Sequence, residues 1–114
     1  MKKKAYLICP VRKLTDEERV IIDGSIAGIK AEFNLYIPYE QKQDCDGKEI
    51  CERNRKALID AEMVFVWWNP TSEGSIFDFG MLYALDKPVR VINDIVRTPQ
   101  KSYSNVLDDI REKN

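Results

Sequence analysis

Apolar and polar residues recur with two different periods along the chain, and these periods predict alternating strands and helices. Short apolar runs bounded by polar or turn-forming residues are typical of buried strands. They predict strands at residues 5–9, 34–38, 63–68 and 89–92. Apolar residues spaced by three or four positions mark one face of a helix. They predict helices at residues 16–33, 49–61, 75–85 and 99–110, the last fraying over 111–114.

Local signals at the element ends support these boundaries. Thr15 and Glu18 have the spacing of a capping box, and Thr98-Pro99 resembles a helix start with a capping Thr. Pro38 cannot donate a ladder hydrogen bond, so the second strand is expected at or near a sheet edge. Trp67 and Trp68 point to opposite faces of the third strand, one into the core and the other a candidate to stack on a flat ligand.

The order strand, helix, strand, repeated along 114 residues, predicts one three-layer α/β domain over residues 1–114. Its parallel sheet should have about four to five strands, with right-handed crossovers and helices on both faces. We expect the strand order 2-1-3-4, which places a switch point between the first and third strands. Ligands of such sheets bind at the carboxyl ends of the strands.

Composition narrows the classes of function. The net charge of −1 argues against a nucleic-acid partner held by bulk positive charge. No apolar run approaches the roughly 20 residues that cross a membrane, so no membrane partner and a cytoplasmic location are expected. Three cysteines and no histidine fit neither a disulfide framework nor a common zinc site. We therefore expect no metal, and proton transfers must use carboxylates, Tyr, Lys, Cys or water.

Polar residues gather at the expected switch point. Asp78 could act as a nucleophile or stabilise positive charge, or it could simply support the start of its helix. Glu73 could act as an acid or accept ligand hydroxyls, and Arg12 could clamp a phosphate or carboxylate; each could also be a solvated surface residue. The backbone amides of Gly74 and Ser75 could hold an anion at the helix start. On pattern alone, the first-strand residues Tyr6 and Cys9 are expected to be core.

Three segments together resemble the nucleoside 2-deoxyribosyltransferase family. They are residues 6–10 (YLICP), 61–66 (AEMVFV) and 73–89 (EGSIFDFGMLYALDKPV). The family pattern has a Tyr-Leu-x-Gly-Pro first strand and an Ala-Asp strand entry. Its last segment reads Ser-Gly-Thr-x-x-Glu-x-Gly-x-Ala-x-Ala-x-x-Lys-Pro. The likeness covers nearly the whole chain in order and is specific mainly in its last segment.

This resemblance implies a flavodoxin-like fold and cleavage of the N-glycosidic bond of deoxynucleosides. In the transferases a Glu nucleophile forms a covalent deoxyribosyl intermediate, whereas related deoxynucleoside 5'-monophosphate N-glycosidases hydrolyse the bond. The family nucleophile falls on Asp78, the first-strand Tyr on Tyr6 and the first-strand Gly on Cys9. The Asp that usually follows the third strand falls on or near Asn69. Three of these four positions depart from the family residue.

The sequence therefore predicts a nucleoside 2-deoxyribosyltransferase-like enzyme, either a transferase or a hydrolase, that acts on a small-molecule nucleoside or nucleotide. The expected catalytic residues are Asp78, Glu73 and Tyr6. The expected substrate-binding residues are Cys9, Pro10, Arg12, Trp68, Asn69, Gly74 and Ser75. No metal or redox cofactor is expected. The family assembles as dimers or larger, and Gly24 and Gly28 could allow a close helix contact within the domain or in a homodimer.

Two other functions are compatible with the same fold. Because Asp78 and Asn69 differ from the family residues, the chain could be a non-catalytic nucleotide-binding module. It could also be a flavodoxin-type flavin carrier, but the loop after the first strand lacks the Ser, Thr and Gly residues that would hold the flavin phosphate.

Overall fold

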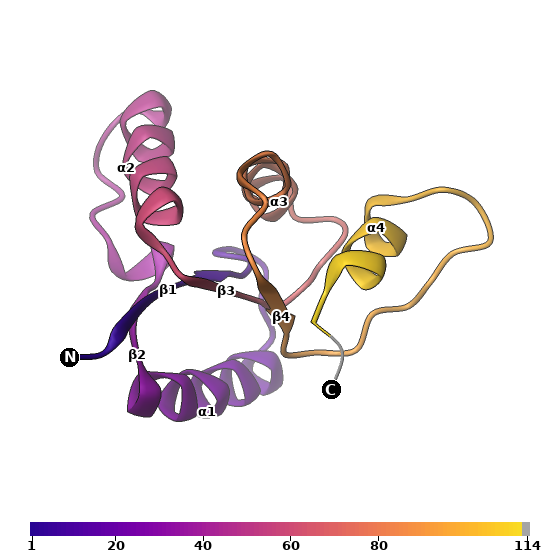
Figure 1. Ribbon diagram of the computed structural model, residues 1–114, viewed down its shortest axis with the longest axis horizontal. Helices are drawn as coiled ribbons and strands as arrows, with labels where there is room; N and C mark the ends of the chain where they lie inside the picture. The colour runs from indigo at the N-terminus through magenta and orange to yellow at the C-terminus, as the bar shows by residue number, and fades with distance from the viewer. Residues whose placement is uncertain (113–114) are drawn as a thin grey trace.

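The computed structural model describes residues 1–112, which form one sheet of four parallel strands with helices on both sides (Figure 1). The strands are β1 (Lys3–Ile8), β2 (Phe33–Tyr36), β3 (Met63–Val66) and β4 (Val89–Val91). The helices are α1 (Asp16–Glu32), a 3-10 turn η1 (Pro38–Glu40), α2 (Gly47–Asp60), α3 (Glu73–Leu85) and α4 (Tyr103–Ile110). The strand order is β2-β1-β3-β4 and every pairing is parallel, which confirms the predicted topology and the edge position of β2.

Two apolar clusters cover the two faces of the sheet. Successive residues of a strand point to opposite faces, so Leu7 faces α1 while Tyr6 and Ile8 face the other helices. Among the helices that the structure describes, α1 covers one face, and α2, α3 and α4 lie over the other (Figure 1). Both tryptophans after β3 are buried, Trp67 towards α1 and Trp68 towards α3 and α4.

The predicted capping box at the start of α1 is present. The backbone N–H of Glu18 donates to Thr15 Oγ1 at 3.1 Å, and the Thr15 N–H donates to Glu18 Oε1 at 3.2 Å. The buried face of α1 consists of Ile22, Ile26 and Ile29. Gly24 and Gly28 lie on its exposed side, with no atom within 4 Å of an added Cβ. They therefore mediate no close helix contact within the described chain.

The prediction of the last helix was wrong at its start. Ser102, not Thr98, caps α4, and its Oγ accepts the Asn105 N–H at 3.2 Å. The Thr98 N–H instead donates to the Asn105 side chain at 2.9 Å, so the Thr-Pro pair belongs to a loop tied to α4. Tyr103, the first residue of α4, is 62% exposed.

The end of the chain also differs from the expectation of fraying. The backbone N–H of Glu112 donates to Val89 O at 2.8 Å, and its carboxylate pairs with Arg90 at 2.9 Å. The segment after α4 therefore returns to β4. Residues 113–114, also expected to fray, lie outside the described residues.

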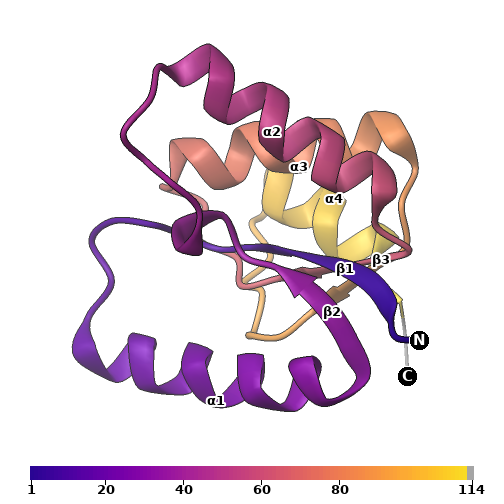
Figure 2. The ribbon, with the colours of Figure 1, turned by 90° about the vertical axis from the view of Figure 1, so that its left-hand side faces the viewer.

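The connecting loops place the functional region. Figure 2 shows the loops that follow β1 and β2 at the same end of the molecule as the start of α3. The loop between β3 and α3 lies at the carboxyl end of β3, next to the end of β1, because β1 and β3 are neighbours in the sheet. The strand order thus brings the end of β1 and the start of α3 together at the switch point.

Candidate active site

A tyrosine of β1 and an aspartate of α3 meet across the switch point. The Tyr6 hydroxyl donates a hydrogen bond to Asp78 Oδ2 at 3.0 Å. Tyr6 is fully buried, whereas Asp78 is partly buried beside the core positions Phe79 and Leu82 of α3. The two residues are 72 positions apart in sequence, so only the parallel pairing of β1 with β3 and the following crossover bring them together.

The environment of Asp78 brings the pKa of its carboxyl close to physiological pH. Burial raises the pKa of Asp78 from 3.8 to about 6, and the hydrogen bond from Tyr6 opposes that rise by favouring the carboxylate. The helix begins at Glu73, so Asp78 lies in the second turn, beyond the reach of the N-terminal dipole. At neutral pH the group is mainly a desolvated carboxylate.

Tyr6 serves this carboxylate as a neutral donor. Burial raises the pKa of the Tyr6 hydroxyl far above its usual value, and the negative charge of Asp78 raises it further. The hydroxyl therefore keeps its proton at neutral pH. Such a donor can hold one carboxylate oxygen and leave the other free to react.

Sequence reasoning missed Tyr36 and Asn54, which extend this arrangement to β2 and α2. The Tyr36 ring stacks on the Tyr6 ring, with centroids 5.3 Å apart and an interplanar angle of 15°. The Tyr36 hydroxyl donates to Asn54 Oδ1 at 2.9 Å. Asn54 could have been found, since it occupies a core position of α2 four residues from both Ile50 and Leu58. Tyr36 could not have been identified in this way, because its place beside Tyr6 depends on the register of β1 with β2, which the sequence pattern does not show.

The start of α3 offers a second polar group. Ser72 caps the helix by accepting the Ser75 N–H at 3.3 Å. Ser75 is only 2% exposed, and its Oγ is buried with no hydrogen-bond partner in the described structure. Because an unsatisfied buried hydroxyl is costly, a ligand atom is a natural partner for it. Gly74, the preceding residue, is exposed.

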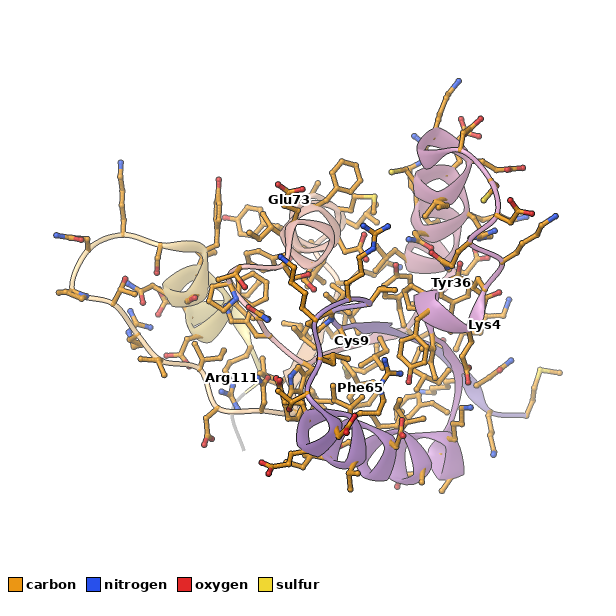
Figure 3. All side chains as sticks on the ribbon, turned by 180° about the vertical axis from the view of Figure 1, so that it is seen from behind. Lys4, Cys9, Tyr36, Phe65, Glu73 and Arg111 are labelled. Carbon is orange, nitrogen blue, oxygen red and sulfur yellow. The ribbon has the colours of Figure 1, made fainter. Side chains whose placement is uncertain are left out.

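Four other predicted site residues, Glu73, Arg12, Pro10 and Cys9, form no hydrogen bond with Asp78 in the described part of the chain. Glu73 is exposed, and Figure 3 shows it on the outer side of α3, pointing away from the sheet. Arg12 is exposed in the loop after β1, while Pro10 is buried there. Cys9 is buried on the α1 side of the sheet, and burial raises the pKa of its thiol to about 12. The thiol is therefore protonated at neutral pH.

Two residues after β3 have structural partners. Asn69 Oδ1 accepts hydrogen bonds from the Thr71 N–H at 2.9 Å and the Thr71 hydroxyl at 2.7 Å, which closes a local turn. The Trp68 indole N–H donates to Ser104 Oγ at 2.8 Å, and its ring packs edge-on against Phe79. Both side chains thus stabilise the loop that leads into α3.

A groove of about 480 Å³ opens between the start of α3 and α4. Its lining consists of Trp68, Pro70, Ile76, Lys101, Ser102, Tyr103, Ser104 and Val106. Ile76 and Asp78 are two residues apart on α3, so their side chains leave the helix about 200° apart. The groove therefore lies on the opposite flank of α3 from the Tyr6–Asp78 pair.

Two classes of site receive no support in the part of the chain that the structure describes. Residues 1–112 contain no group of three or more Cys, Asp and Glu side chains that could hold a metal ion. None of the helices in this range is long and apolar enough to cross a membrane.

The fold and the site define a flavodoxin-like α/β protein with a partly buried phenol–carboxylate pair at the switch point of its sheet. Neither protein-family models nor sequences of curated proteins match the chain. Solved structures do match it, at low sequence identity.

The 2-deoxyribosyltransferase of Bacillus psychrosaccharolyticus matches with a TM-score of 0.68 and 16% identity, over 95% of this chain and 82% of that one. The Clostridium botulinum CMP N-glycosidase matches with a TM-score of 0.61 and 13% identity, over 78% and 70%. A Leishmania mexicana 2-deoxyribosyltransferase matches with a TM-score of 0.60 and 18% identity, over 79% and 63%. The chain shares its fold with these enzymes.

Proposed function

We propose that the chain is a nucleoside 2-deoxyribosyltransferase-like enzyme that breaks an N-glycosidic bond, with Asp78 as the nucleophile. The observation that carries this proposal is the hydrogen bond from Tyr6 to Asp78 at the switch point. The motif likeness around residues 73–89 and the fold shared with two deoxyribosyltransferases and an N-glycosidase support it. Substrates would be small nucleosides or nucleotides.

The chemistry needs only the carboxylate and water. Oδ1 of Asp78, the oxygen that Tyr6 does not hold, attacks C1' of the sugar as the C1'–N bond breaks. The bonding pair leaves with the base nitrogen, which takes a proton from solvent. Water then attacks C1', the bond to Asp78 breaks, and the carboxylate is regenerated as the water proton returns to solvent. With a second base in place of water, the same intermediate gives transfer.

The binding roles follow the same geometry. Ser75 Oγ, buried without a partner beside Asp78 on α3, would donate to a sugar or phosphate oxygen, and the exposed backbone at Gly74 would assist. Arg12 is exposed in the loop after β1 and would bind a 5' phosphate. Pro10 and Asn69 would shape the substrate site through the loops after β1 and β3. Cys9 and Trp68 would act only indirectly, because Cys9 is buried on the α1 side and Trp68 lines the groove on the other flank of α3. Glu73 would reach a ligand only at its outer edge.

A non-catalytic nucleotide-binding module is the second candidate. One observation favours it: Asn69 is engaged by Thr71, and Glu73 points away, so neither places an acid beside Asp78 to protonate a leaving base. Such a protein would bind the same ligands and leave the glycosidic bond intact.

Self-association is part of the proposal, because α3 has an apolar surface that the described chain leaves uncovered. This helix, Glu73–Leu85, carries two charged residues, Glu73 at its start and Asp78. Phe77 is 54% and Tyr83 60% exposed, although a helix that is apolar on all sides is normally buried. A second copy of the chain packed on this face would bury both rings and add a wall beside Asp78.

Phe77→Glu is expected to convert a dimer into a monomer, because a charge replaces the exposed ring on α3. Light scattering at assay concentration gives the mass of each form. Val20→Glu is a matched control, an exposed apolar residue of α1 on the other side of the sheet. A wild-type monomer would contradict the proposal, and dissociation by Val20→Glu alone would move the interface to the face that carries Gly24 and Gly28.

The activity itself is tested by incubating the protein with deoxynucleosides and their 5'-monophosphates, with and without free acceptor bases. Chromatography should show release of free base, and exchange of bases if the enzyme transfers the sugar. The Asp78→Asn protein is the control for contaminating activity. Binding of these ligands without release of base by the wild-type protein would favour the binding module over the enzyme.

The three free thiols support a reducing compartment such as the cytoplasm.

A further inference from the structure

We propose that Tyr36 is a positioning residue for Asp78, acting through the ring of Tyr6. The inference rests on the proposed function, in which Asp78 reacts with the sugar. Three contacts in series carry it: Asn54 fixes the hydroxyl of Tyr36, Tyr36 supports the ring of Tyr6, and Tyr6 holds Asp78.

The first step is the strand register. Tyr6 and Tyr36 are directly paired in the parallel ladder of β1 with β2, so their side chains leave the same face side by side. The rings are nearly parallel and stacked, with their centroids 5.3 Å apart. The strand β2 lies at the edge of the sheet, next to β1. On the side of Tyr6 that faces β2, the ring of Tyr36 is therefore its neighbour on the sheet.

The second step is geometry within the phenol. The oxygen of a tyrosine lies on the ring axis, so rotation about that axis does not move it, whereas a tilt of the ring does. The stack on Tyr36 limits this tilt. The distance of 3.0 Å from the Tyr6 hydroxyl to Asp78 Oδ2 therefore depends on where the Tyr36 ring lies.

The third step is the anchor of Tyr36 itself. A tyrosine on an edge strand is free to swing outward unless something holds it. Its hydroxyl donates to Asn54 Oδ1 at 2.9 Å, and Asn54 is only 8% exposed on α2. Figure 3 shows Tyr36 next to α2, on the same side of the sheet as α3. The anchor thus links α2 to the reacting carboxylate on α3.

The charged and titratable groups around this chain of contacts are few. Asp78 interacts electrostatically with Tyr6 and Cys9 of the first strand and its end, and with Tyr36 of β2. From α2, Arg53 interacts with Tyr36. Tyr6 is the one that donates a hydrogen bond to Asp78 in the described structure. Loss of burial would lower the pKa of Asp78, whereas loss of the Tyr6 hydrogen bond would raise it. A rise in the pKa of Asp78 after a substitution at Tyr36 would therefore report on the Tyr6 hydrogen bond.

The test compares Tyr36→Leu, which removes the ring, with Tyr36→Phe, which keeps the ring and removes the anchor. Tyr39→Leu is the matched control, since Tyr39 packs with the cluster on the α1 face. Two readouts are used: the titration of the Asp78 carboxyl by NMR in the free protein, and kcat and KM for base release. The titration does not depend on turnover.

For Tyr36→Leu we expect the Asp78 titration to move to higher pH and kcat to fall about tenfold, the effect of losing a hydrogen bond to a charged group. KM should change little, and Tyr39→Leu should leave the Asp78 titration as in wild type. Tyr36→Phe should move the titration in the same direction by less, and it carries the test if Tyr36→Leu does not fold.

An Asp78 titration that is the same in wild type and in the folded Tyr36 variants would overturn the positioning role. This outcome is separate from failure of the proposed function. If wild-type protein releases no base from any substrate, the enzyme proposal fails, while a shifted titration would still place Tyr36 in control of Asp78.

Discussion

Replacing Asp78 by Asn is expected to remove glycosidic-bond cleavage while making the folded chain more stable. The substitution keeps the size of the side chain but removes the charge that would form the bond to C1'. Loss of a nucleophile costs turnover by roughly three orders of magnitude or more. Ligand binding should largely remain, because Ser75 and the start of α3 are unchanged.

The gain in stability follows from the sign of the pKa change. A pKa raised from 3.8 to about 6 corresponds to about 3 kcal/mol against the ionised form of Asp78. This cost is present above pH 6 and disappears as the pH falls through 6 towards 3.8, because the folded state then binds the proton more strongly than the unfolded state. Asn carries no such cost, so its advantage should be largest near neutral pH and fade in acid.

Melting temperature and base release, measured on the same samples between pH 4 and pH 8, separate two roles for this residue. Asp94→Asn, in an exposed loop, is the control and should change neither quantity. If Asp78 merely supported the helix start, Asn would cost about 0.3–1 kcal/mol of stability and leave turnover intact. Turnover close to wild type in the Asp78→Asn protein would remove the nucleophile from the proposal.

Much of the fold could be predicted because its signals are local. The change of period from strand to helix fixed the order of elements, and the alternation within Tyr6, Leu7 and Ile8 follows the pleat. The expected strand order 2-1-3-4, with its switch point between the first and third strands, is confirmed. The start of α4 could not be predicted, because a Thr-Pro pair is compatible with both a helix cap and a turn. In the structure the Asn105 side chain holds Thr98 in the loop, and the Asn105 N–H is capped by Ser102 instead.

The site was less predictable because its determinants are non-local. Asp78 could be singled out by its place in the motif, but its burial, which sets the direction of its pKa change, depends on how α3 packs on the sheet. The partnership of Tyr36 with Asn54 requires both the β1–β2 register and the docking of α2. A polar residue on the apolar stripe of a helix, as at Asn54, is the one local sign that such a network exists.

The sharpest test of the phenol–carboxylate pair is Tyr6→Phe, which keeps the buried ring and removes its hydroxyl. The hydrogen bond lowers the pKa of Asp78, so its loss should raise that pKa above the value of about 6. A hydrogen bond to a charged group is worth about 1.5–3 kcal/mol, which corresponds to about one to two pH units. The acid limb of the profile of kcat/KM against pH should therefore move to higher pH by that amount.

Activity of the Tyr6→Phe protein should consequently fall much more at pH 6 than at pH 9, where Asp78 is ionised in both proteins. Tyr103→Phe, which changes an exposed tyrosine of α4, is the control and should keep the wild-type profile. A superimposable profile for Tyr6→Phe would mean that the hydroxyl does not act on the reacting group and that Tyr6 contributes only its ring to the core. A uniform loss at every pH would instead show that Tyr6 orients Asp78 without changing its charge.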